Sequence, residues 1–422
     1  MTNKTRGGFW SLITVSCRNI TRNTRRTAMC VVAVAIAVFF TVVMQSMMSG
    51  MMKGIENVVQ VFDTGHVSIV SAEYEADNEY MPVQYPIAGG KSRAELEAEI
   101  KAVPGVREVF PRISAYATLQ DSTVKHAILW GIDAEAETAF NYFNMTNRTN
   151  GLTAGRFPAA GSNECAIGAR MAEKAGLKIG DEIPLKTISA QFSDKMWAPK
   201  IVGIYTFDYL KYDDGGILVD YGRLARLLSM GDSVQQLFIY ADNSMRSKTI
   251  AAQISSLLGK GDVVRDWRDN YFVAVMRQSA VIFYAVELVF LIVASFLIIN
   301  TVIMIIHERI KEIGMMGSLG MTRREIVEVF FFEALFLSVL GSLAGAVLGG
   351  IVTFTGSFFP LDFNAMTGAG LKDFPISGTL FLEFSVSILA SSFGFGVLIA
   401  SVCTLIPSLK SAFVEPVEAL RR

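Results

Sequence analysis

The chain has 422 residues, of which 51% are hydrophobic and 18% are charged, and its mean hydropathy is +0.40. Its net charge of −1 speaks against a nucleic-acid partner, and its four scattered cysteines speak against a disulfide framework or a cysteine metal site. This composition is typical of membrane-spanning segments attached to a sizeable polar region.

The N-terminal part combines a basic segment with a long apolar run. Residues 1–27 hold six lysines and arginines and no acid, and we interpret them as an amphipathic cytoplasmic segment. Residues 28–52 hold no charge at all. A cleaved signal peptide is the alternative, but the apolar run and the basic segment before it are both too long for one. The sequence therefore predicts a retained first membrane span over residues 28–52.

Methionines gather toward the end of this predicted span. Met44, Met47, Met48 and Met51 recur at the spacing of one helix face, which Phe40 continues. Methionine is flexible and is used on surfaces that accept varied apolar shapes. The stripe therefore either forms such a surface, or faces bulk lipid, or packs on another span.

Residues 53–278 form a polar region that is long enough for one large domain or two small ones. HVSIVSA, HAILWGI and KIVGIYTF are strand-like runs, and SRAELEAEIKAV predicts a helix that Ser92 caps and that ends before Pro104. A second helix is expected to stop at Gly176. The pattern predicts a mixed α/β domain, and any division of it is expected near residues 187–199.

Three further apolar runs are long enough to cross a bilayer, which takes about 20 residues. They cover residues 279–306, 329–354 and 380–406, separated by loops over 307–328 and 355–379 and followed by a tail over 407–422. Together with the first run, they predict four membrane spans.

Each of these three runs contains one acid, at Glu287, Glu333 and Glu383. Acids inside a membrane are costly and are candidates for function. Glu333 and Glu383 lie near the ends of their runs, so we interpret them as hydrated groups near the interfaces. For Glu287 the functional and the structural readings both stay open.

Three glycines in the third predicted span recur four residues apart, at Gly341, Gly345 and Gly349. Small residues at this spacing let membrane helices pack closely against one another. We expect a contact within the chain, with a seam between two copies of the chain as the alternative.

The distribution of lysine and arginine indicates the orientation, because cytoplasmic segments are enriched in them. Residues 1–27, the loop over 307–328 and the tail over 407–422 hold several each, whereas the loop over 355–379 holds only Lys372. We therefore expect both termini in the cytoplasm and the region 53–278 on the other side of the membrane.

The loop over residues 307–328 carries eight charges between two apolar runs. Ile310, Gly314 and Gly317 share one face of a predicted short helix, for which Gly320 is a natural end. Thr322-Arg-Arg-Glu325 then matches a capping box that starts the next helix. A solvated hairpin is the alternative, but the length of the loop and its glycines favour a surface on which a partner docks.

The segment ERIKEIGMMGSLGMTRREI resembles the cytoplasmic loop of FtsX-like and MacB-type ABC transporter permeases. The stretches CRNITRNTRRT, TGHVSIVSAEYE, VPGVREVFPRI and PSLKSAFVEPVEALR extend the resemblance over most of the chain, which is most similar to the lipoprotein-releasing permeases of the Lol type. The resemblance implies a membrane α-helical fold of four transmembrane helices with a large mixed α/β extracytoplasmic domain of the MacB periplasmic type.

The same resemblance implies that the loop is a coupling helix, which docks on a cytoplasmic ATPase. The candidate docking residues are Glu308, Arg309, Glu312, Gly314, Gly317 and Gly320. The chain departs from its relatives at Gly317 and Ser318, where they usually have a basic residue and an alanine. We therefore expect the loop as a whole to dock on an ATPase, but we assign no contact with the ATPase to any single residue.

The function that the resemblance implies is a permease subunit in the bacterial cytoplasmic membrane. It would extract lipoproteins, or similar amphiphiles, from the outer leaflet and pass them to an envelope carrier. The implied partners are a dimeric ABC ATPase that binds ATP and Mg, a second permease copy or paralogue, the lipoprotein and membrane lipid. The residues expected to line the path of the acyl chains are Phe40, Met44, Met47, Met48 and Met51.

Three alternatives stay open. An FtsX-like regulator would transmit ATPase motion to an extracytoplasmic hydrolase, although its outer domain is usually smaller. A MacB-like component would export peptides or drugs. A plain sensor or scaffold would have no ATPase partner.

The chain is expected to have no catalytic, cofactor or metal site of its own. GGKS at residues 89–92 lacks the first glycine of a phosphate-binding loop, whose place Tyr85 takes, and Pro86 removes an amide. Asp213-Asp214 is interpreted as a turn before a strand. The three histidines show no ligand spacing with acids or cysteines: His66, His126 and His307. We therefore expect that the chain is not an enzyme.

Overall fold

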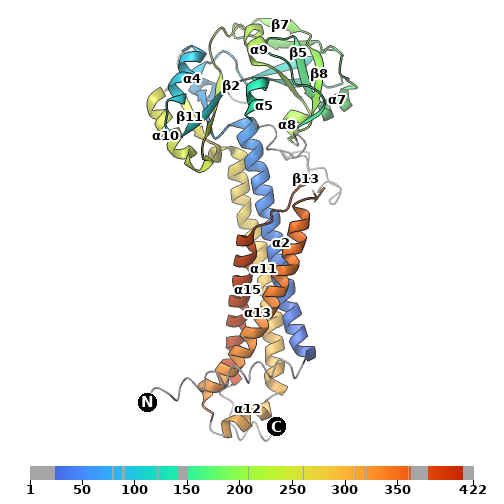
Figure 1. Cartoon of the computed structure of the whole chain (residues 1–422), viewed down its shortest axis with the longest axis vertical. Coiled ribbons are helices and arrows are strands. Elements are labelled where there is room, and N and C mark those ends of the chain that lie inside the picture. Colours follow the sequence, from blue (N-terminus) through green and yellow to red (C-terminus); the bar gives the residue numbers. More distant parts are fainter. Residues whose placement is uncertain are drawn as a thin grey trace. The chain divides into compact units, whose positions relative to one another are not determined.

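A computed structural model describes residues 24–77, 80–87, 91–120, 123–140, 151–207, 209–259, 261–308, 310–318, 321–359, 361–362 and 379–411. The chain forms two units (Figure 1). The helical unit comprises Met1–Met51, Gln278–Leu361 and Leu380–Arg422, and the α/β unit comprises Met52–Arg277 and Asp362–Thr379.

Four long helices run through the helical unit. They are α2 (Thr24–Val58), α11 (Tyr271–Glu308), α13 (Arg323–Gly356) and α15 (Val386–Ser411). Each contains a stretch that is long and apolar enough to cross a membrane. The first two extend past the predicted spans and continue into the α/β unit, because residues such as Ile55 and Val58 are buried in that unit.

The fourth helix starts at Val386, six residues later than the predicted span. Strand β13 (Thr379–Leu380), which pairs with β12 (Leu361–Asp362), and an extended stretch precede it. The Ser46 hydroxyl donates to the Glu383 carbonyl at 2.6 Å, and the Glu383 amide donates to the Ser46 carbonyl at 3.2 Å. These bonds to α2 hold the stretch extended, because a helix would use the same backbone groups itself.

The α/β unit is built on one eleven-stranded sheet with the order β11-β1-β10-β2-β3-β9-β5-β8-β4, with β6 and β7 attached beside β2. The strands are β1 (Val67–Ser71), β2 (Val106–Leu119), β3 (His126–Ile132), β4 (Leu152–Gly155), β5 (Glu164–Gly168), β6 (Leu185–Ile188), β7 (Asp194–Trp197), β8 (Lys200–Tyr205), β9 (Gly216–Asp220), β10 (Gln236–Ala241) and β11 (Asp262–Asp266). The pairs β3–β9 and β5–β8 are parallel, and the others are antiparallel.

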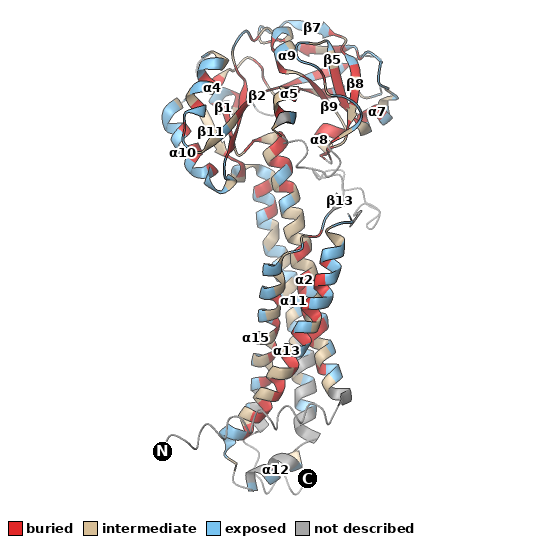
Figure 2. Cartoon of the chain, in the orientation of Figure 1, coloured by how far each residue is buried: buried red, intermediate tan, exposed pale blue. Residues whose placement is uncertain are grey.

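Strand β2 has 14 residues and joins the two halves of the sheet, since it pairs with β10 through its first part and with β3 and β6 through its second. Figure 2 shows that buried residues concentrate along the strands. The expected division near residues 187–199 falls within the hairpin of β6 and β7, so it is not a boundary.

Short helices cover the sheet. They are η1 (Val59–Asp63, a π-helix that continues α2), α3 (Ala72–Ala76), α4 (Arg93–Lys101), α5 (Ala134–Ala139), α7 (Ala169–Ala175), α8 (Leu210–Asp213), α9 (Tyr221–Leu227), η4 (Ser244–Arg246), α10 (Ser247–Leu258) and η5 (Trp267–Asp269).

Two of the predicted helix signals are confirmed in the α/β unit. Ser92 and Glu95 form a capping box on α4. Gly176 ends α7 with φ +68, a conformation that favours glycine. The predicted turn before a strand is found at Asp214, just before β9, whereas Asp213 is the last residue of α8, and its buried carboxylate accepts from the Phe207 amide at 2.9 Å.

Candidate functional site

The expected docking segment contains a separate short helix, α12 (Ile310–Ser318), which lies between α11 and α13 (Figure 1). Thr322 caps α13 and forms the predicted capping box with Glu325, so this prediction is confirmed. Gly314 is buried, whereas Met315 is 49% exposed. Lys311, Met315 and Ser318 are exposed at i, i+4 and i+7, so one face of α12 is open for contact.

The other candidate docking residues are described only in part. Arg309 and Gly320 lie outside the described residues. Glu308 is the last residue of α11, and Glu312 and Gly317 lie in α12, where the structure describes the backbone alone. Their contact with an ATPase stays a prediction.

The three spaced glycines lie on the face of α13 that packs against α2. A methyl group added at Gly341 would lie 2.7 Å from Val34 Cβ. At Gly345 it would lie 2.9 Å from Val38 Cβ and would also overlap the Ala35 carbonyl oxygen. At Gly349 the nearest atom would be Val42 Cβ, at 2.8 Å. The two helices therefore approach more closely than any side chain at these positions would allow.

The predicted acyl-chain face on α2 is partly covered within the helical unit. The Phe40 ring, which is 42% exposed, stacks on Phe290 of α11 with ring centroids 5.5 Å apart. The methionines Met44, Met47, Met48 and Met51 are all half-buried. Phe40 therefore has a packing role, and the role of the methionines in admitting acyl chains stays a prediction.

Two of the three membrane acids are bound by polar side chains of α2. Gln45 Nε2 donates to Glu287 Oε1 at 2.9 Å, and the Ser49 hydroxyl donates to Glu383 Oε2. The interpretation of Glu333 as a hydrated group is wrong, because this residue is only 8% exposed. Glu333 is one of the buried residues of α13. Its position near the end of the predicted span does not predict this burial.

The end of the α2–η1 helix lies in a ring of hydrogen-bond donors, which we call the socket. Its donors come from Tyr240 on β10, Arg112 on β2, Lys211 and Tyr212 on α8, and Tyr209 just before α8. A helix end leaves its last carbonyls without helical partners. Here the hydroxyl of Tyr240 donates to the Gln60 carbonyl at 3.2 Å, and that of Tyr212 donates to the Phe62 carbonyl at 3.0 Å.

The socket also binds the residues on either side of Phe62. Arg112 Nη2 and the Tyr240 hydroxyl each donate to the Val61 carbonyl at 3.4 Å. The Asp63 carboxylate accepts from the Tyr209 hydroxyl at 2.6 Å and from Lys211 Nζ at 3.3 Å. The helix that leaves the helical unit is thus fixed to three different elements of the α/β unit.

Behind the socket, Arg112 forms an ion pair with Glu137 of α5 at 2.5 Å, and both side chains are at most 2% exposed. Burial raises the pKa of Glu137 above the ordinary range of a carboxyl group, and the charge of Arg112 partly offsets this. Neither the socket nor this pair was predicted from the sequence, because the donors and acceptors are far apart in the chain and no local pattern marks them.

Comparisons with known proteins agree on one family. Residues 27–257, more than half of the chain, match the family model of the MacB-like periplasmic core domain. Residues 284–416 match the FtsX-like permease C-terminal model.

Among the curated relatives is the lipoprotein-releasing system transmembrane protein LolC of Haemophilus influenzae, which is 24% identical over 275 residues, or 62% of this chain and 65% of that protein. LolC of Neisseria meningitidis is 22% identical over 64% of this chain and 68% of its own length. The macrolide export ATP-binding/permease protein MacB of Bdellovibrio bacteriovorus is 29% identical over 54% of this chain and 31% of its own length. The match thus spans just under two thirds of the Haemophilus protein.

Two solved structures cover the α/β part. The extracellular domain of the transporter YknZ from Gram-positive bacteria gives a TM-score of 0.31 at 14% identity, over 47% of this chain and 99% of that domain. The periplasmic region of MacB from Actinobacillus actinomycetemcomitans gives 0.34 at 13% identity, over 54% of this chain and 97% of that region. On the strength of the two family models, the chain belongs to the FtsX-like ABC transporter permeases that carry a MacB-like periplasmic core domain.

Proposed function

We propose that this chain is the permease subunit of an ATP-driven transporter that draws lipoproteins, or similar amphiphiles, out of the outer leaflet of the bacterial cytoplasmic membrane. A carrier in the envelope receives them. In this proposal both termini and α12 face the cytoplasm. A dimeric ATPase there binds ATP and Mg, and a second permease copy or paralogue completes the transporter. Similarity to LolC supports this choice of cargo.

The observation that carries the proposal is the length of the two helices that lead into the α/β unit. The 38 residues of α11 make a rod of about 57 Å, whereas the hydrocarbon core of a bilayer is about 30 Å thick. α2 has 35 residues and continues through η1 into the socket. An unbroken helix passes a displacement of one end to the other, so motion of α12 on an ATPase would reach the α/β unit without a channel.

Purification of the full chain in mild detergent, followed by reconstitution with whatever ATPase accompanies it, tests this proposal. We expect ATP-dependent transfer of a labelled lipoprotein from the proteoliposome to a soluble carrier. The absence of any ATPase partner would contradict the transporter reading altogether.

The same preparation separates the alternatives. ATP-dependent activation of an added envelope hydrolase, without lipoprotein transfer, would favour the FtsX-like regulator. ATP-dependent transport of a peptide or drug, without lipoprotein transfer, would favour the MacB-like component.

A further inference from the structure

A groove of about 580 Å³ lies between α13 and α15 in the helical unit. Its floor includes Ala346 and Gly350 of α13, which are buried. Leu389 of α15 packs against Gly350, where an added Cβ would meet both of its methyl groups at 3.4 Å. These short residues leave a hollow, because the side chains beside them are longer and exposed. The exposed rim comprises Leu343, Val347 and Ile351 of α13 and Val386 of α15.

The residues that line the groove, all of them described, include no charged side chain. Thr355 is the one polar member of this lining, and its hydroxyl donates to the Ile351 carbonyl at 2.7 Å. The lining therefore needs no hydrogen-bond partner. An occupant would be held by the burial of apolar surface alone.

The length of the groove matches one leaflet of a bilayer. From Leu343 to Thr355 the helix rises about 18 Å, at about 1.5 Å a residue. Half of the roughly 30 Å hydrocarbon core is about 15 Å. Dividing the volume by the length gives a mean cross-section of about 32 Å², whereas an α-helix about 10 Å across covers about 80 Å². The groove is therefore too narrow for a helix of a partner chain, and it suits a single extended hydrocarbon chain.

Phenylalanine rings lie at the end of the groove near Thr355. The Phe354 ring meets Phe384 edge to face, with the ring centroids 5.3 Å apart, and meets Phe358 in the same way at 5.0 Å. Phe384 belongs to the extended stretch before α15, which the bonds between Glu383 and Ser46 hold on α2. This end of the groove is thus shaped before any occupant binds, which lowers the cost of ordering it.

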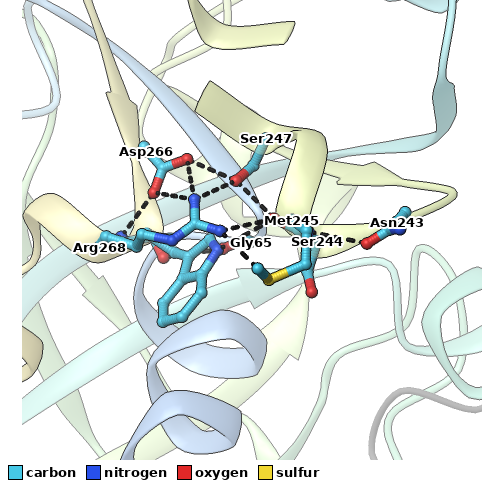
Figure 3. Close-up of polar contacts among 9 residues, drawn as sticks. Gly65, Asn243, Ser244, Met245, Ser247, Asp266 and Arg268 are labelled. Carbon is cyan, nitrogen blue, oxygen red and sulfur yellow. Dashed lines mark hydrogen bonds and ion pairs between the residues drawn. The ribbon is translucent and has the colours of Figure 1, made fainter. Parts of the chain in front are cut away.

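A polar cluster in the α/β unit offers no comparable site, because its members bond to one another. Arg268 Nη1 donates to the two carboxylate oxygens of Asp266 at 3.0 and 3.1 Å and to the Ser247 hydroxyl at 3.1 Å (Figure 3). These bonds fix η5, which leads into α11, to the start of α10. A polar ligand would have to break them, whereas an apolar occupant of the groove has no hydrogen bond to displace.

We propose that the groove is a binding site for one acyl chain of a membrane phospholipid. Phospholipid is the bilayer's own supply of such chains, and the groove opens along a helix that is long and apolar enough to cross a membrane. Residues 343–355 lie in the C-terminal half of α13, so in the proposed orientation the lipid belongs to the outer leaflet. That leaflet assignment rests on the proposed function, whereas chain binding does not. The bound chain fills the space between α13 and α15 and so stabilises this pair.

Photolabelling with a phospholipid that carries a diazirine in one acyl chain tests the proposal. The full chain is purified in mild detergent, titrated with this probe and illuminated, and the adducts are mapped by mass spectrometry. We expect saturable labelling of Val347 and Ile351 on the rim, several-fold above that of Leu348 and Val352. The latter two are exposed on the same stretch of α13 but lie outside the lining. Equal labelling of the two pairs would identify ordinary solvating lipid and overturn the proposal.

Ala390→Trp is a variant that fills the groove, because Ala390 lines it from α15 and is exposed. Ser391→Trp is the matched control, since its neighbour Ser391 is also exposed but lies outside the lining. We expect Ala390→Trp to lower the adduct yield at Val347 several-fold and Ser391→Trp to leave it unchanged. A wild-type yield in Ala390→Trp would contradict occupation of the groove.

The melting temperature of the same proteins gives a second readout. A ligand that binds only the folded chain stabilises it. Added phospholipid should therefore raise the melting temperature of the wild type and of Ser391→Trp more than that of Ala390→Trp. An equal rise in all three proteins would contradict a stabilising chain in the groove.

Competition identifies the source of the chain. Unlabelled phospholipid should remove the adduct at Val347, whereas a phospholipid with chains too short to fill the groove should not. A lipoprotein at the same concentration should leave the adduct in place. Removal of the adduct by the lipoprotein and not by phospholipid would overturn the assignment to phospholipid.

Discussion

The guanidinium of Arg112 donates to the carboxylate of Glu137 across 2.5 Å, and the same Nη2 donates to the Val61 carbonyl at the end of the α2–η1 helix. Replacing Arg112 with methionine would leave the Glu137 charge buried without its partner. Breaking a buried pair in this way costs about 3–5 kcal/mol. We expect a clear drop in the melting temperature of the full chain in detergent.

The double change Arg112→Met and Glu137→Leu is the control for this prediction. Well-packed apolar side chains often replace a buried pair at little cost. The double variant should therefore melt above the single variant. A single variant as stable as the wild type would contradict the structural role of the pair.

Gly345→Leu should lower membrane levels and thermal stability, whatever substrate is present. A side chain there would overlap the Ala35 carbonyl and lie against Val38 of α2. Gly394 of α15 is the matched control, because a Cβ there would meet nothing within 4 Å, and Gly394→Leu should be tolerated. Equal stability of the two variants would refute a close contact between α13 and α2.

Gly317→Phe should leave the permease folded and abolish stimulation of ATP hydrolysis by substrate. Gly317 lies in α12, and the added ring would separate this helix from a docked ATPase. Melting temperature and steady-state ATPase rates are measured on the same preparation. Ordinary complex formation with normal stimulated turnover would show that α12 is not the docking helix.

A photo-crosslinker at Met48 should label lipoprotein before ATP is added and lose that label after turnover. Met48 is half-buried in α2, two turns beyond the aromatic contact of Phe40 with Phe290. The same group at Val32, which is 53% exposed elsewhere on α2, should label phospholipid only. Labelling of phospholipid alone at both positions, unchanged by ATP, would identify the methionine stripe as a lipid-facing surface.

Stability should fall as pH falls from about 6.5 to about 4 because of His66. Burial lowers the pKa of His66 from 6.5 to about 4, so the unfolded chain binds the proton more tightly than the folded one. The Ala241 amide donates to Nδ1 at 3.0 Å, which requires the neutral ring. Arg268 nearby opposes the charged form, and Asp266 favours it.

The stabilisation is fully present above pH 6.5 and amounts to up to about 3 kcal/mol. His66→Asn keeps an acceptor for the Ala241 amide but cannot titrate. Its melting temperature should therefore depend less on pH between 4.5 and 7 than that of the wild type. His126→Asn, at an exposed position on β3, should behave as the wild type does. Parallel pH profiles for all three proteins would rule out this role of His66.

Features with local causes could be predicted from the sequence. Ser92 with Glu95, and Thr322 with Glu325, lie three residues apart, so the sequence alone specifies each capping box. Long apolar runs likewise predicted the four helices, because crossing a bilayer constrains length and composition directly. Gly176 could be assigned to a helix end because its conformation is strained for other residues.

Features with distant causes could not. The late start of α15 depends on Ser46, which is 337 residues from Glu383 in the chain. The socket depends on Tyr240, which is 180 residues from Gln60. The sequence of a strand does not indicate which distant carbonyl a tyrosine side chain donates to, because this depends on the tertiary fold.

The socket limits how α2 can move. Successive carbonyls at Gln60, Val61 and Phe62 each have their own donor, and turning the helix by one residue, about 100°, would take all of them away from their donors together. Small rotations are therefore penalised at every bond, whereas a shift along the axis that carries the donors with it costs nothing there. These hydrogen bonds therefore oppose rotation of α2 about its own axis, and they would stay intact if the helix and its donors shifted together along that axis.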